Sequence, residues 1–132
     1  MKLLLPYPPS MNHYWRRVGP RTLISREGRT FRRNVCALLG GNGLPPVKGR
    51  LALCMDAFPP DRRRRDLDNL QKPLLDALEH AGIYEDDGQI DLLITRRMEP
   101  KPNGKLIVRI DRLPLLCCPL CGVRVPQRSD TR

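Results

Sequence analysis

The sequence contains no apolar stretch approaching the roughly 18 residues that a membrane-spanning helix requires. Its first apolar run, Leu3–Leu5, stops at Pro6 and is too short for the apolar part of a secretory signal peptide. The five cysteines form no framework of spaced pairs through the body of the chain. These absences argue against a membrane protein and against a disulfide-stabilised secreted domain. They predict a protein of the reducing cytoplasm that has no membrane partner.

Acidic residues are scarce relative to basic ones. The chain has 24 Lys and Arg against 14 Asp and Glu, a formal net charge of +10. Such a surface attracts polyanions, because Lys and Arg near phosphates release condensed counterions. We therefore expect a nucleic-acid partner, with a charge that only maintains solubility as the alternative. At 132 residues the chain has room for one hydrophobic core, which predicts one domain.

The pattern of apolar residues predicts an α+β fold. Residues 25–39 and a stretch ending at Ala81 repeat apolar residues at helical spacing. We expect a mixed β-sheet with these two main helices packed on it. The predicted element order is β-α-β-α-β-β, with strands at residues 2–7, 47–58, 89–98 and 105–111.

Local signals set the boundaries of these elements. Ser25 is the expected N-cap of the first helix, and the glycine-rich stretch 40–43 ends it. Gly82 is expected just after the second helix. We place the start of that helix near Lys72, because Pro73 fits the first turn of a helix but disrupts its interior. Two segments are predicted as a loop, 11–24, and as a hairpin turn joining the last two strands, 100–104.

The residues that suggest chemistry lie between Asp61 and Lys72. Four consecutive cations, Arg62–Arg65, precede Asp66 and Asp68, and Asp87 follows nineteen residues after Asp68. Clustered carboxylates repel one another unless a cation lies between them. Magnesium accepts carboxylate oxygens and keeps positions open for water and phosphate. A metal bound in this way activates water and stabilises the charge that develops on phosphorus.

Each part of this pattern also has a purely structural interpretation. Asp66 and Asp68 suit the start of a helix, and the arginine run suits a solvated face. Lys72 can neutralise a phosphate as a point charge, or it can simply pair with a nearby aspartate. Taken together, cations for the DNA backbone and acids for a metal predict a metal-dependent nuclease.

The same stretch closely resembles the signature of RusA-type Holliday-junction resolvases. The run from Pro59 to Lys72 carries the likeness, which covers roughly residues 3 to 111. Met11, Pro73 and the C-terminal tail depart from the family pattern. The other matching parts are Leu5–Ser10 with Asn12, Arg21–Thr22, Ser25 to Gly28, Asp76–Leu78, Ala81–Gly82, and Asp86–Asp87 followed by Gln89.

This resemblance implies a small homodimeric, magnesium-dependent endodeoxyribonuclease. Such an enzyme resolves four-way (Holliday) junctions by paired symmetric nicks in DNA recombination and repair, and two-fold symmetry suits paired cuts. The family pattern assigns the catalytic and metal-binding carboxylates to Asp66, Asp68 and Asp87, and the essential lysine to Lys72. The compact size of the family suggests a phage or prophage origin. A non-catalytic branched-DNA-binding protein and a general metal-dependent nuclease are the alternative functions.

DNA contacts are expected mainly from Arg62–Arg65. Asn69, Arg16 and Arg17 are further candidates for contact with the phosphate backbone. Tyr14 or Trp15 is a candidate for stacking on an unpaired base, with packing in the core as the alternative.

The chain is predicted to divide into an endonuclease domain, 1–113, and a basic cysteine-containing tail, 114–132. Cys118 and Cys121 have the C-x-x-C-G spacing of a zinc knuckle. A structural zinc needs four ligands, and the chain offers no second pair of this kind. Three alternatives follow: a four-thiolate site shared between two protomers, recruitment of Cys117 or His80, and a flexible tail without metal.

Overall fold

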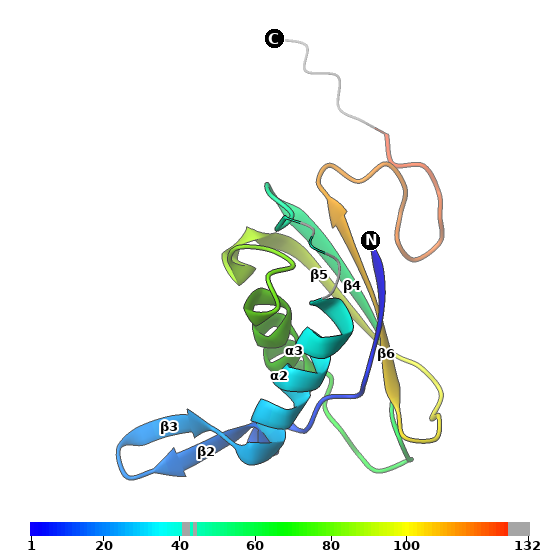
Figure 1. Cartoon of the computed structure of the whole chain (residues 1–132). Helices are drawn as coiled ribbons and strands as arrows, with labels where there is room; N and C mark the ends of the chain where they lie inside the picture. Colours follow the sequence, from blue (N-terminus) through cyan, green and yellow to red (C-terminus); the bar gives the residue numbers. More distant parts are fainter. Residues whose placement is uncertain (41–42, 44, 127–132) are drawn as a thin grey trace.

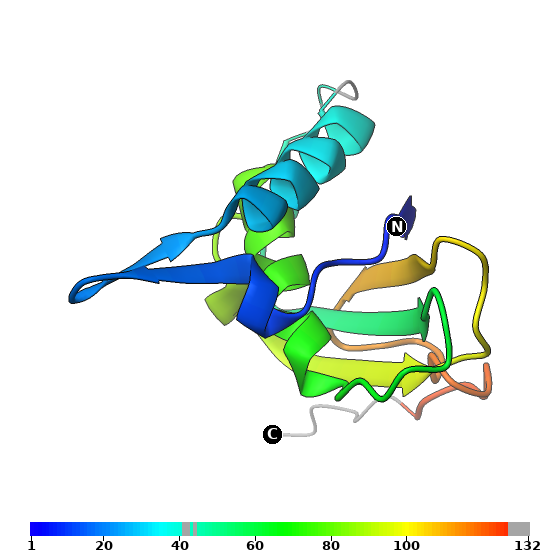
Figure 2. The same cartoon turned by 90° about the horizontal axis from the view of Figure 1, so that it is seen from below.

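The computed structural model describes residues 1–40, 43 and 45–126 (Figure 1). A four-stranded sheet carries two long helices on one face, and a two-stranded hairpin projects from the body of the molecule (Figure 1, Figure 2). The predicted α+β class with a mixed sheet and two main helices is confirmed. The elements are β1 (Lys2–Leu5), α1 (Met11–Tyr14), β2 (Trp15–Val18), β3 (Arg21–Ile24), α2 (Arg26–Leu39), β4 (Leu51–Phe58), α3 (Asp68–His80), η1 (Asp87–Gln89), β5 (Ile90–Arg97) and β6 (Lys105–Arg112).

The strands of the main sheet lie in the order β1-β6-β4-β5. β4 pairs antiparallel with β6 and parallel with β5, so it separates the last two strands of the chain. The predicted hairpin at residues 100–104 is therefore wrong. The chain does turn there, at Asn103 and Gly104 with positive φ, but it crosses to the far side of β4. β4 takes the central position because all of its residues except Phe58 are buried, as suits a strand covered on both faces.

The hydrophobic core fills the space between the inner face of this sheet and the two helices. Burial of each large apolar side chain contributes about 1.5–3 kcal/mol, which holds α3 against the strands. Among the described helices, none is long and apolar enough to cross a membrane. The main buried members of the core are Leu51, Leu53 and Met55 of β4, Leu106, Val108 and Ile110 of β6, Phe31 and Val35 of α2, and Leu70, Leu74 and Leu78 of α3.

The start of α2 follows the prediction. Ser25 is the N-cap, and its Oγ accepts a hydrogen bond of 3.0 Å from the amide of Gly28. The same hydroxyl donates to the carbonyl of His13, so the cap also ties the base of the hairpin to the helix. α2 ends at Leu39, where the glycine-rich stretch begins, but residues 41 and 42 of that stretch lie outside the described part of the chain.

The start of α3 differs from the prediction. The helix begins at Asp68 and contains Pro73, so the expected start near Lys72 is wrong. The ring of Pro73 is fully buried in the core, and its missing amide deprives only the carbonyl of Asn69 of the usual intrahelical partner. Burial of the ring offsets that loss. As a consequence, Asp68 and Lys72 lie one turn apart on the same side of one helix. The predicted Gly82 follows the helix with a φ of 77°.

The segment 11–24 is a short helix and a hairpin, and the predicted loop is wrong. β2 pairs with β3 from Trp15 opposite Ile24 to Val18 opposite Arg21. Only the base of this hairpin packs against the core; the side chains toward its tip are exposed. Since both faces of the ribbon are solvated, its sequence shows no alternation of apolar residues, and this explains why the strands were not predicted.

Candidate active site

The loop between β4 and α3 is shaped by one of its own acids. We call residues Asp61–Arg65 the arginine loop. The carboxylate of Asp61 accepts hydrogen bonds from the amide of Arg63 at 2.9 Å and from the Arg65 guanidinium at 2.6 and 3.1 Å. These hydrogen bonds lower the pKa of Asp61 to about 2, and the bond from Arg65 has the largest effect. Arg65 is thus neutralised within the loop, whereas Arg62 and Arg64 present their guanidinium groups to solvent.

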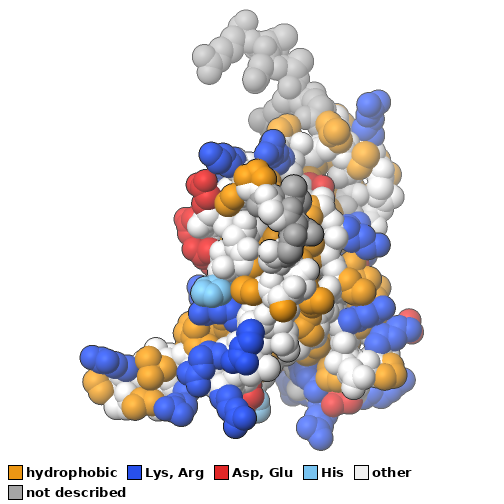
Figure 3. Space-filling view, viewed as in Figure 1, with side chains coloured by type: hydrophobic (Ala, Val, Ile, Leu, Met, Phe, Trp, Pro, Cys, Tyr) orange, Lys and Arg blue, Asp and Glu red, His pale blue; other side chains and the backbone are white. Residues whose placement is uncertain are grey.

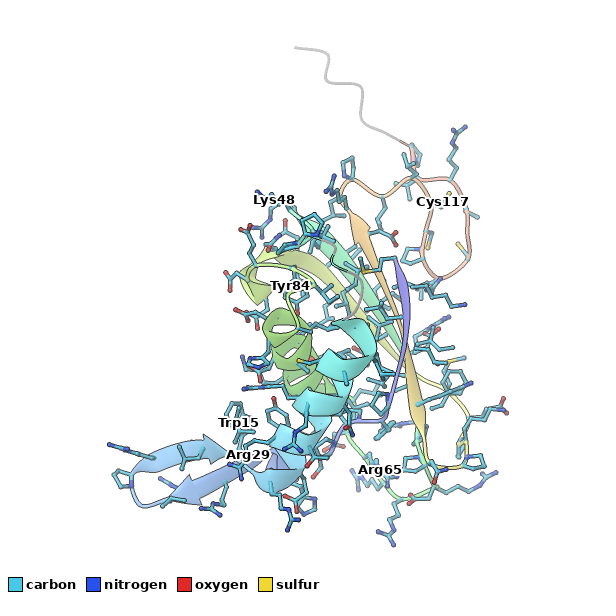
Figure 4. All side chains as sticks on the ribbon, in the orientation of Figure 1. Trp15, Arg29, Lys48, Arg65, Tyr84 and Cys117 are labelled. Atoms are coloured by element: carbon cyan, nitrogen blue, oxygen red, sulfur yellow. The ribbon has the colours of Figure 1, made fainter. Side chains whose placement is uncertain are left out.

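Arg65 also joins the arginine loop to the N-terminal segment. Its guanidinium lies 5.9 Å from the centre of the Tyr7 ring, and its carbonyl accepts a hydrogen bond from Arg97. Arg65 is thus half-buried and held by contacts within the protein, whereas Arg62, Arg63 and Arg64 are exposed. The predicted contact of all four arginines with DNA stays a prediction. Figure 4 shows Arg65 at the end of the molecule near the base of the hairpin.

The arginine loop separates two hollows. The smaller, of about 440 Å³, lies between the loop and the start of the β5–β6 connection. The larger, of about 980 Å³, lies between the loop, α2 and the proline-rich segment after β1. Asp66 lines both hollows, and Asn69 lines the larger one. The larger groove is also lined by Pro6, Tyr7, Pro8, Pro9, Ser10, His13, Arg26, Glu27, Thr30, Phe31, Asn34, Pro60, Arg63, Arg64, Arg65, Leu70 and Asn103.

α3 brings the predicted lysine to one of the predicted acids. Lys72 Nζ lies 3.7 Å from Oδ2 of Asp87, the first residue of η1. Asp68 lies one helical turn before Lys72, and its side chain is exposed. Asp68, Lys72 and Asp87 therefore follow one another from the start of α3 toward residues Glu85–Asp87, which we call the acidic turn. Asp66, which precedes the helix, faces the arginine loop and the two hollows.

Three carboxylates meet at the other end of this series. Glu79, Asp86 and Asp87 each place a carboxylate oxygen within 4.8 Å of the others, and this is the one such group in the described part of the chain. Oxygen donors of this kind suit a hard divalent cation. Asp66 and Asp68 do not belong to the group. Glu79 was missed from the sequence, although it lies seven residues after Lys72, on the same side of the helix.

A single glutamine holds the acidic turn in place. The side-chain oxygen of Gln89 accepts the amides of Glu85 and Asp86, at 2.9 and 3.1 Å. Its side-chain nitrogen donates to the carbonyls of Val47 and Gly49, at 3.0 and 2.9 Å. Because every one of these bonds fixes backbone, Gln89 positions Asp86 and Asp87 relative to the sheet.

The remaining acid on this side of α3, Asp76, is structural. It accepts hydrogen bonds of 2.5 Å from the Tyr14 hydroxyl and from the Arg32 guanidinium. Burial opposes ionisation of Asp76, but these two bonds outweigh it and hold the pKa of the carboxyl below its ordinary value. The three side chains tie α1, α2 and α3 together. Tyr14 is completely buried, so its predicted stacking on a DNA base is wrong.

Basic side chains gather at the hairpin. Arg16 and Arg17 lie on β2 and are exposed, as is Arg21 on β3. Figure 3 shows Lys and Arg side chains along the hairpin and the adjoining end of the molecule, with a separate group of acids farther up the same flank. This separation of charge suits a partner that presents a row of phosphates.

Comparison with known proteins identifies the family. Residues 6–111 match the family described as Endodeoxyribonuclease RusA. The chain belongs to the RusA family. The crossover junction endodeoxyribonuclease rusA of Enterobacteria phage HK97 is 44% identical over 113 residues, which are 85% of this chain and 94% of that protein. The proteins of the same name from Enterobacteria phage 82 and Escherichia coli K12 are 42% and 40% identical over 116 residues, 84% of this chain and 93% of each relative.

The RusA match covers the arginine loop, α3 and the acidic turn, and it ends before the cysteines of the tail. The resemblance found in the run from Pro59 to Lys72 is thus confirmed at the level of the family.

Proposed function

We propose that this chain is a magnesium-dependent endodeoxyribonuclease that resolves four-way DNA junctions by paired symmetric nicks in recombination and repair. One observation carries the proposal: Lys72 contacts Asp87 in a chain that belongs to the RusA family. Lys72 lies on α3, the helix that starts at Asp68 just after the arginine loop. The relatives are named for crossover junctions. Phage proteins among them support a prophage origin, and a protein that acts on DNA is expected in the cytoplasm.

The metal role is assigned to Asp66, Asp68 and Asp87. All three offer carboxylate oxygens, which suit Mg²⁺ and not a soft cation, and Asp87 lies within 4.8 Å of the carboxylates of Glu79 and Asp86. When bound, the metal supplies an activated water and stabilises charge on the phosphate.

The chain's own cations complete the site. Lys72 points its ammonium at the acidic turn and can neutralise the scissile phosphate as a point charge. The exposed Arg62, Arg63 and Arg64, with Asn69 in the groove, hold the flanking backbone, and Arg16 and Arg17 hold a second arm of the junction. A homodimer places two such sites about one two-fold axis, as paired cuts require.

The test is cleavage of a labelled synthetic four-way junction in Mg²⁺, with excess linear duplex as competitor. Wild type and Asp68→Asn are compared, together with Lys2→Gln as a control that changes an exposed residue of β1, at the opposite edge of the sheet from β5. We expect symmetric paired nicks from wild type and from the control. We expect Asp68→Asn to leave the junction uncut, because a proposed metal ligand is lost. Binding should be retained, since the change removes a negative charge near phosphate.

Binding without cleavage by the wild type would instead support a non-catalytic branched-DNA-binding protein. Cleavage that linear duplex suppresses would support a general nuclease. Either result would overturn the junction-specific function.

A further inference from the structure

The chain beyond β6 forms an ordered turn. We call residues 117–124 the cysteine turn. The amide of Cys118 donates to the carbonyl of Val123 at 2.7 Å, and the amide of Gly122 donates back to the carbonyl of Cys118 at 2.8 Å. A bridge between Cys117 and Arg124 closes the turn. Gly122 has a φ of 75°, which a side chain would strain. The chain thus folds back on itself within residues 117–124, and residues 127–132 lie outside the described part.

The turn gathers backbone donors around one sulfur. The thiol of Cys118 accepts hydrogen bonds from the amides of Leu120 and Cys121 and interacts with the Cys121 thiol. Two cysteines three residues apart, with amides directed at the first sulfur, are the arrangement by which zinc knuckles stabilise thiolate ligands. Both thiols are free.

One chain supplies only half of such a site. Structural zinc takes four ligands in a tetrahedron. No third Cys, His, Asp or Glu joins Cys118 and Cys121 within reach of a common ion among the described residues, so recruitment of Cys117 or His80 within the chain is not supported. Two further thiolates therefore have to come from another molecule.

The surroundings of the cysteine turn suit a second copy of the same turn. Leu116, Leu120 and Val123 flank the thiols and are 68%, 49% and 66% exposed. Arg124 is the one charged residue in the described stretch 114–126. Four thiolates around Zn²⁺ carry two net negative charges, and one arginine from each chain balances them. The three apolar side chains of each turn would lose their exposure on association.

We propose that Cys118 and Cys121 form half of a four-thiolate zinc site, which the same two cysteines of a second copy of this chain complete. The site is separate from the acids of α3: Cys117 and Arg65 lie at opposite ends of the molecule (Figure 4). It also lies beyond residue 111, where the RusA match ends. Zinc would thus join two chains through their tails without taking part in cleavage.

Metal content and ligand type test this site independently of nuclease activity. The full chain is purified under reducing conditions, loaded with Zn²⁺, dialysed, and its zinc and protein are quantified. We expect one zinc for every two chains. Titration of the metal-free protein with Co²⁺ should end at the same ratio, with the intense visible bands of a tetrahedral site and the sulfur-to-cobalt charge transfer of four thiolates.

Serine variants identify the ligands. Cys118→Ser and Cys121→Ser should each abolish the cobalt spectrum, whereas Cys117→Ser and the control Cys36→Ser should keep it. Sedimentation at low protein concentration should show that removal of zinc weakens self-association of the wild type. A variant lacking both Cys118 and Cys121 should show no response to the chelator.

Three results would overturn the proposal. These are one metal per chain, a spectrum that survives Cys118→Ser, and sedimentation that is unchanged after complete metal removal. Loss of cleavage plays no part in this test, so failure of the nuclease proposal would leave the metal readouts intact.

Discussion

The ammonium of Lys72 and the carboxylate of Asp87 lie 3.7 Å apart, although fourteen residues separate them in the chain. The contact connects the exposed side of α3 to the acidic turn, and it brings the predicted lysine to one of the predicted acids. If Lys72 acts on the phosphate, Lys72→Gln should slow single-turnover junction cleavage by about 100-fold or more, as loss of a charge-stabilising donor does.

Junction affinity should fall far less than the cleavage rate, because one of many phosphate contacts is lost. Lys2→Gln is the matched control, since Lys2 is also an exposed lysine but lies on β1, at the opposite edge of the sheet from β5. An equal loss of affinity and cleavage rate in Lys72→Gln would instead make this residue a simple binding contact.

The carboxylate group formed by Glu79, Asp86 and Asp87 predicts a graded response to magnesium. Asp87→Asn should abolish cleavage at all Mg²⁺ concentrations, because the proposed metal ligand is lost. Glu79→Gln removes a charge within 4.8 Å of that group and should raise the Mg²⁺ concentration for half-maximal cleavage several-fold, with the maximal rate retained. Magnesium titrations of both variants measure this. A Glu79→Gln titration curve that overlays that of wild type would show that Glu79 has no influence on the metal.

The arginines of the loop should separate into two classes. Arg62 and Arg64 are exposed, so a double change to Gln should lower the slope of log affinity against log salt by about one to two. Arg65 is bound to Asp61 and lies over Tyr7, so Arg65→Gln should change the shape of the loop. We expect Arg65→Gln to lower the cleavage rate strongly while it changes the slope of log affinity against log salt only slightly. If the Arg62/Arg64 double variant and Arg65→Gln had equal salt slopes and equal cleavage rates, Arg65 would not differ in role from the exposed arginines.

The hydrogen bonds of Asp76 predict an acid-dependent stability. Because the pKa of Asp76 is lowered in the folded protein, its contribution is present above the unfolded value of about 3.9 and is lost as pH falls through the folded value. Asp76→Asn should therefore reduce stability at neutral pH by about 2 kcal/mol, a typical value for hydrogen bonds to a charged group. The difference from wild type should shrink on acidification below about pH 4.

Thermal melts of wild type and Asp76→Asn across this pH range provide the measurement. Tyr14→Phe serves as the control, because it removes one hydrogen bond and leaves the carboxylate paired with Arg32. A stability difference that stays constant from neutral to strongly acidic pH would show that ionisation of Asp76 does not contribute.

The features that the sequence by itself determined are local ones. Ser25 caps α2 because its hydroxyl reaches an amide three residues away, and Gly82 ends α3 because it tolerates a positive φ. The periodicity of apolar residues likewise predicts the helices and the strands of the main sheet. The run from Pro59 to Lys72 identified the family, because the identities of neighbouring residues are sufficient for a motif of that length.

Tertiary structure decided the features that depend on contacts between distant residues. The turn residues Asn103 and Gly104 indicate that the chain reverses, but they do not indicate which strand β6 pairs with. In the structure the buried strand β4 lies between β5 and β6. Pro73 is accommodated within α3 because the core covers its ring, which no local rule foresees. The proximity of Glu79 to Asp87 depends on the path of the chain after α3, because carboxylates distant in sequence meet only when the fold brings them together.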